Sequence, residues 1–219
     1  MATWYSDEDT RKLGDERVSL LRRRLLIQER FLQHHFKSEE AKNFGVYGFS
    51  RRLSTLVRCI ENTFSVIPPE FYGVPTLEQT HDVMIHVQAF IFNVFGCLDN
   101  LAWVWVKEEN ITKADGQPLP RTRVGLQPDN RFVRNSLRQE LRDLLQGMTD
   151  WFAYLEDVRH ALAHQIPLYV PPFSVDPKNE KRYNDLEQSI LKLSLERKNS
   201  EALERERDSL MFFRHVIVS

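Results

Sequence analysis

One long apolar stretch constrains the fold of this 219-residue chain more than any other feature. Thr76 followed by Gln79 is a capping-box pattern, and it predicts a helix over 77–109. Residues 83–106 are the most apolar part, long enough to span a bilayer, but they include five polar side chains that would be costly in lipid: His86, Gln88, Asn93, Asp99 and Asn100. We therefore expect the buried central helix of a soluble bundle, with no membrane partner.

Apolar residues at three- to four-residue spacings predict further helices on both sides of this stretch. We expect them over 15–36, 50–66, 131–165 (bent near Gly147) and 181–210, the last strongly charged with a thin apolar stripe. The 50–66 helix should end before Pro68 and Pro69, because a residue that precedes proline is pushed out of helical geometry.

Glycine and proline mark the segments that should not be helical. Residues 110–130 hold two glycines and three prolines and are predicted to form a long loop. Four prolines over 166–177 predict an extended segment, and residues 211–218 alternate like a strand.

These elements together predict one all-α domain over 1–219. We expect an antiparallel up-and-down helical bundle with a long charged C-terminal helix. The core should span about 15–172, and the C-terminal helical extension about 178–219.

Composition narrows the class of protein only a little. The net charge of −1 gives no global attraction to nucleic acid. Arginine outnumbers lysine by 21 to 9, a bias that weakly favours phosphate recognition but fits ordinary helix surfaces equally well. Cys59 and Cys97 lie in apolar helical contexts and predict reduced, buried thiols of a cytoplasmic protein.

The segment 159–164, Arg-His-Ala-Leu-Ala-His, is the strongest functional signal. Arg159 supplies a permanent cation, and His164 is of the residue type that titrates near neutrality. Cleavage of an RNA phosphodiester without metal needs both a proton-transfer group and a charge that holds the phosphate. The same spacing occurs at Arg30 and His35, but there it lies in a polar helix and looks like a solvated face.

Residues 152–172, and above all 158–164, resemble the motif helix of the HEPN superfamily, whose signature is Arg-x4–6-His with a polar residue after the arginine, here His160. The run 97–103 is similar to the earlier helix of such domains, which often supplies an acidic residue, here Asp99. The resemblance spans about 77–172. It implies a helical bundle, metal-independent RNA cleavage or RNA binding, a homodimer, and a defence or toxin–antitoxin setting with an antitoxin protein as partner.

On these positions His164 would transfer a proton and Arg159 would neutralise the phosphate, with Asp99 orienting one of the two. Residues five apart are rotated by roughly 140° on a straight helix, so Arg159 and His164 do not share a face. His160 and His164 do share one, which makes His160 a further candidate.

Two other interpretations stay open. Asp99 and Asn100 could satisfy Arg159 and His164 in a buried structural network of a non-catalytic interaction or oligomerisation protein. A metal site through His160 and His164 is weaker, because the repeated Glu-x-x-His and the His-Glu-x-x-His patterns are absent. We expect no metal and no cofactor.

Overall fold

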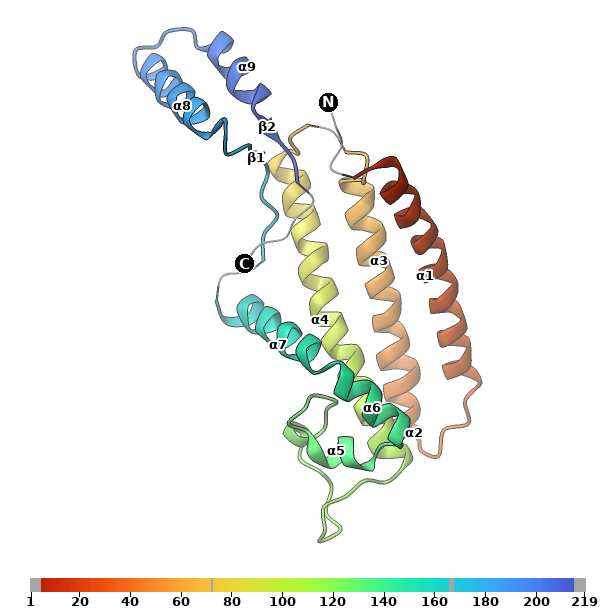
Figure 1. The fold of residues 1–219 in the computed structure, drawn as a ribbon. Helices are drawn as coiled ribbons and strands as arrows, with labels where there is room; N and C mark the ends of the chain where they lie inside the picture. Colours follow the sequence, from red (N-terminus) through yellow and green to blue (C-terminus); the bar gives the residue numbers. More distant parts are fainter. Residues whose placement is uncertain (1–4, 72, 166–167, 215–219) are drawn as a thin grey trace.

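The computed structural model, which describes residues 5–71, 73–165 and 168–214, is an all-α bundle as predicted. Three long helices lie side by side and alternate in direction: α1 (Asp7–Gln33), α3 (Ser50–Val66) and α4 (Leu77–Glu108) (Figure 1). A fourth long helix, α7 (Thr149–His164), crosses α4 obliquely.

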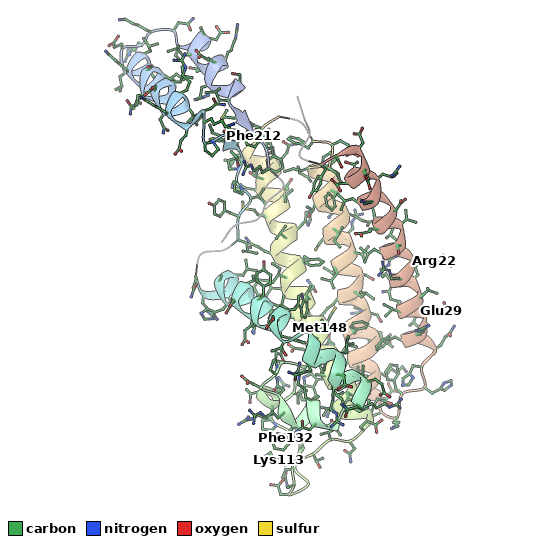
Figure 2. The ribbon with its side chains drawn as sticks, in the orientation of Figure 1. Arg22, Glu29, Lys113, Phe132, Met148 and Phe212 are labelled. Atoms are coloured by element: carbon green, nitrogen blue, oxygen red, sulfur yellow. The ribbon has the colours of Figure 1, made fainter. Side chains whose placement is uncertain are left out.

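The first helix begins earlier than its apolar spacing predicts. Ser6 caps it by accepting a hydrogen bond from the Asp9 amide, and acidic residues fill the first turn, where the helix dipole favours negative charge. The helix has no buried residue, and Arg22 and Glu29 lie on its side turned away from the bundle (Figure 2). It ends at Gln33; α2 (Glu39–Lys42) and the π-helical η1 (Asn43–Phe49) then lead directly into α3.

The central helix α4 carries the predicted capping box, in which Thr76 and Gln79 bond each other's backbone amides. It contacts α2, η1, α3 and α7. By length and composition α4 is one helix that could cross a membrane, a test that core helices of soluble proteins also pass. Its burial is one-sided, since Ile85 and Phe92 are 62% and 43% exposed.

The prediction of one bent helix over 131–165 is wrong. This region forms three helices: α5 (Arg131–Ser136), α6 (Gln139–Gly147) and α7, with Met148 at the joint between the last two (Figure 2). The 110–130 loop, which includes the short η2 (Arg121–Arg123), folds back onto them. One core cluster joins the loop, the three helices and the second half of α4: Ala102, Val106, Leu119, Val124, Leu126, Val133, Leu137, Leu145 and Phe152.

Arg134 ties this part together. Its Nε donates to the Leu126 carbonyl oxygen at 2.8 Å and its Nη2 to the Leu145 carbonyl oxygen at 3.0 Å. The guanidinium also lies 5.4 Å from the centre of the Phe152 ring. Burial lowers the pKa of Arg134. Its guanidinium nevertheless keeps three partners, which are a carbonyl oxygen of the loop, a carbonyl oxygen of α6 and the Phe152 ring of α7.

The C-terminal extension is not one long helix. It consists of α8 (Glu180–Leu195) and α9 (Glu201–Ser209), which pair through contacts such as the Arg207–Glu187 ion pair at 2.8 Å. The turn between them contains Arg197 with a φ of 52°, and the pair stands off the body (Figure 1). Strands β1 (Ser174–Val175) and β2 (Met211–Phe212) pair antiparallel at its base.

A second core cluster anchors the extension to the bundle. Val170 and Phe213 pack there with Ile67 and Val83, which come from the ends of α3 and α4 that face the extension. The strand predicted over 211–218 is confirmed for its first two residues, whereas 215–219, like 166–167 of the extended segment, lie outside the described residues.

Phe152 is only 2% exposed and sits under Arg134, so Phe152→Ala should lower the free energy of unfolding by about 3–5 kcal/mol in urea denaturation. Tyr154→Ala is the matched control, because Tyr154 lies on the same helix but is 68% exposed. It should change stability by less than about 0.5 kcal/mol. Equal losses in both variants would contradict the packing of α7 described above.

Candidate functional site

The crossing of α4 and α7 gathers the candidate residues. Arg159 projects from α7 onto α4, where its guanidinium carbon lies 5.0 Å from the centre of the Phe95 ring. Phe95 is buried, whereas Arg159 is exposed. The ring therefore supports the cation from below and leaves its N–H groups accessible to a ligand.

Arg159 stands at one end of a groove of about 590 Å³ between α7 and the 122–130 part of the loop. Its α7 wall is formed by Thr149, Ala153, Glu156 and Arg159, and the loop wall is largely polar. The lining on the loop side and the α4 side comprises Phe95, Thr122, Arg123, Gln127, Pro128, Asp129 and Asn130. Arg123 adds a second cation, while Glu156 and Asp129 limit the net charge.

The loop wall depends on close backbone approach. The side chains of Gln127 and Asn130 bond each other at 2.9 Å across Gly125. A methyl group on Gly125 would overlap both side chains, so this buried position has no room for a larger residue. Gly125 and the Arg134 bond to Leu126 together fix the shape of the groove.

The two histidines continue the α7 wall. Ala153, Glu156, His160 and His164 follow at three- and four-residue spacings and share one face of the helix. Both imidazoles are exposed, and their ring centres lie 5.2 Å apart. Arg159 flanks this stripe, and among the described residues no polar contact joins it to either histidine.

Asp99 lies one turn beyond Phe95 on α4 and leans back toward that turn, as helical side chains do. It reaches solvent, yet enough protein surrounds it that desolvation raises the pKa of its carboxyl. A hydrogen bond with Gln127 and the charges of Arg159 and Arg52 oppose that rise without cancelling it. The structure thus places Asp99 beside Arg159, and His160 beside His164.

Arg52 is a further site residue, one of the arginines whose abundance fits ordinary helix surfaces as well as phosphate recognition. It projects from α3 across Gly96 of α4, where a methyl group would overlap its guanidinium. Its Nη1 donates to Asn93 Oδ1 at 3.1 Å. A glycine inside an otherwise continuous apolar helix was the available signal, since such a residue often marks a close approach.

The buried network considered above would require enclosed, mutually bonded side chains. Arg159 and His164 are instead both exposed, and no hydrogen bond links them to Asp99 or Asn100 within the described ranges. Asn100 lies against η1 instead. A methyl group on Gly48 of η1 would lie 2.8 Å from the side-chain amide of Asn100.

The residues that two further site interpretations require do not lie together in the described part of the chain. No cluster of three or more His, Cys, Asp or Glu side chains that could hold a metal is present there. The second Arg-x4-His pair is split, with Arg30 on α1 and His35 beyond its end, both exposed.

Cys97 is buried near Arg52, and burial raises the pKa of its thiol to about 11, as expected for an inert cysteine.

Comparisons with known proteins assign no family. No family model, no curated protein and no solved structure matches the chain.

The raised pKa of Asp99 makes a prediction about pH. The ionised carboxyl is less favourable in the folded than in the unfolded chain, so stability should fall as pH rises from its ordinary pKa of 3.8 through the raised one. Asp99→Asn should therefore melt at a higher temperature than the wild type at neutral pH, and the two should converge as pH falls toward 3.8.

Asp157→Asn, an exposed position on α7, corrects for the general loss of one negative charge. A lower melting temperature for Asp99→Asn at neutral pH would mean that the arginines outweigh desolvation.

Proposed function

We propose that the protein binds RNA and cleaves it without metal at the crossing of α4 and α7. One observation carries this proposal: Arg159 lies accessible at the end of a polar groove while His160 and His164 extend the same wall. The resemblance of this segment to the HEPN motif helix points to the same chemistry.

The reaction needs a general base, a general acid and a positive charge beside the phosphate, and the exposed side chains can supply all three. The ribose 2′-oxygen attacks the adjacent phosphorus, a base takes the 2′-hydroxyl proton, and an acid gives a proton to the departing 5′-oxygen. We assign the base to His164 and the acid to His160, whose rings are neighbours. Arg159 neutralises the charge that grows on the phosphate, and Asp99 helps to orient it. The products are a 2′,3′-cyclic phosphate and a 5′-hydroxyl end.

The wider setting rests on the resemblance, apart from one observation that bears on the dimer. A cytoplasmic homodimer that acts in defence or as a toxin, with an antitoxin protein as regulator, is part of this proposal. Ile85, Phe92 and Asp99 occur at seven-residue spacing on one exposed face of α4, so a two-fold contact along that face would bring two sites together.

A non-catalytic interaction protein is the second candidate. Its support is the number of large apolar side chains that remain exposed on α4, α6 and α7: Ile85, Phe92, Leu141, Leu144, Trp151 and Tyr154. This role would use the apolar surface and leave the histidines without a chemical task.

The direct test is cleavage of a mixed RNA pool by purified protein in EDTA. The wild type should leave 2′,3′-cyclic phosphate ends, and His164→Ala should lower the rate at least about 100-fold, because general acid–base groups contribute that much. His35→Ala, the histidine of the second Arg-x4-His pair, should cleave like the wild type. Melting temperatures within about two degrees of the wild type would show that both variants fold.

Cleavage that persists in His164→Ala at the wild-type rate would remove the assigned base. A folded wild type that neither cleaves nor binds RNA would favour the interaction protein instead.

A further inference from the structure

Two guanidinium groups converge on a single turn of α4. Arg159 reaches Phe95 from α7, and Arg52 reaches the next residue, Gly96, from α3. Both helices pack against α4 (Figure 1). Consecutive residues of a helix point about 100° apart, so the two arginines approach neighbouring faces of the same turn. The charges of both act on Asp99, which lies one turn further along α4.

The position of Arg52 is built into the fold. Gly96 provides the space for the guanidinium to lie on the helix backbone. Asn93 Nδ2 donates to the Ala89 carbonyl oxygen at 2.8 Å, which turns Asn93 Oδ1 toward Arg52 Nη1 at 3.1 Å. Gly96 and the Asn93 amide together hold the guanidinium in one position on α4.

Both arginines keep donors available. In the described part of the chain the bond to Asn93 is the one hydrogen bond of the Arg52 side chain, and Arg159 makes none. Neither forms an ion pair with Asp99 there, although the charges of both act on that carboxyl. At this turn two guanidinium groups face one carboxylate, whereas Glu156 and Asp129 outnumber Arg123 along the rest of the groove. A phosphodiester would therefore be held by the two guanidinium groups themselves and not by the net charge of the groove.

We propose that Arg52 is a second phosphate-binding residue of this site, and that it and Arg159 together hold one phosphodiester group of single-stranded RNA over the Phe95–Gly96 turn. The inference rests on the proposed function for its ligand. It goes beyond the Arg-x4-His motif, because Arg52 lies over a hundred residues before that motif and on a different helix. Planar forks from two sides suit phosphate oxygens better than point charges.

The test is binding of a short 2′-O-methyl RNA, which offers phosphodiesters but cannot be cleaved, measured by fluorescence anisotropy at several salt concentrations. Arg52→Gln should weaken binding about tenfold and reduce the steepness of the salt dependence by about 0.7, the value for one phosphate contact on a single strand. Arg52→Lys should keep most of the salt dependence but lose affinity, since it lacks the fork.

Two matched controls make the result specific. Arg51→Gln removes the neighbouring arginine, which stacks 5.1 Å over Tyr47 instead, and should bind like the wild type. Gly96→Ala should reproduce Arg52→Gln by displacing the guanidinium, whereas Gly147→Ala, with open space around it, should have no effect.

Equal affinity and salt dependence for Arg52→Gln and the wild type would overturn the inference even if the protein cleaves RNA. Arg52-dependent binding without any cleavage would support the phosphate site and reject the nuclease. Absence of binding by the wild type would overturn the inference as well.

Discussion

The packing of α7 across the second half of α4 is the contact on which the rest of the structure depends. Phe152 fills the joint from α7, and Arg134 lies over its ring while it bonds the loop and the end of α6. This arrangement fixes the angle at which α7 leaves the bundle. It thereby sets where Arg159 meets Phe95 and where the loop closes the groove.

The charges of the site follow from that crossing. α3 and α7 flank α4 and each sends one arginine to the same turn, while α4 itself supplies Asp99 one turn further. Desolvation by the surrounding protein raises the pKa of Asp99 although two cations lie near it. The result is an accessible surface that carries both arginines and carboxylates, beside a pair of exposed imidazoles.

The sequence predicted those parts of the fold that local chemistry determines. The Thr76 capping box and the proline pair after Val66 set the ends of α3 and α4 correctly, because caps and prolines act within a few residues. The break at Met148 lies where a bend was predicted near Gly147, whereas the break at 137–138 carries no such signal. Arg134, whose partners lie 8 and 11 residues away, holds the resulting helices together. The turn at 196–200 was missed because it places an arginine, not a glycine, at positive φ.

Some residues of the site could likewise be predicted from local pattern, whereas others depend on how the helices pack. His160 and His164 share a face for reasons of helical period alone, and the structure has their rings together. The pairing of Asp99 with Arg159 was expected from the family resemblance and from the alternative of a buried network, but neither predicted the exposed position of the arginine. Arg52 could not be assigned from local pattern, because its place depends on how α3 packs on Gly96, a contact between residues 44 positions apart.

A double-mutant cycle on the uncleavable RNA, with Arg52→Gln, Arg159→Gln and the double variant, tests most directly whether the two arginines hold one ligand group. If they hold the same phosphodiester, the losses should be non-additive, with an interaction energy of at least about 0.5 kcal/mol. Losses that add within experimental error would mean that the two guanidinium groups act on separate parts of the ligand, and the single phosphate site at the Phe95–Gly96 turn would be wrong.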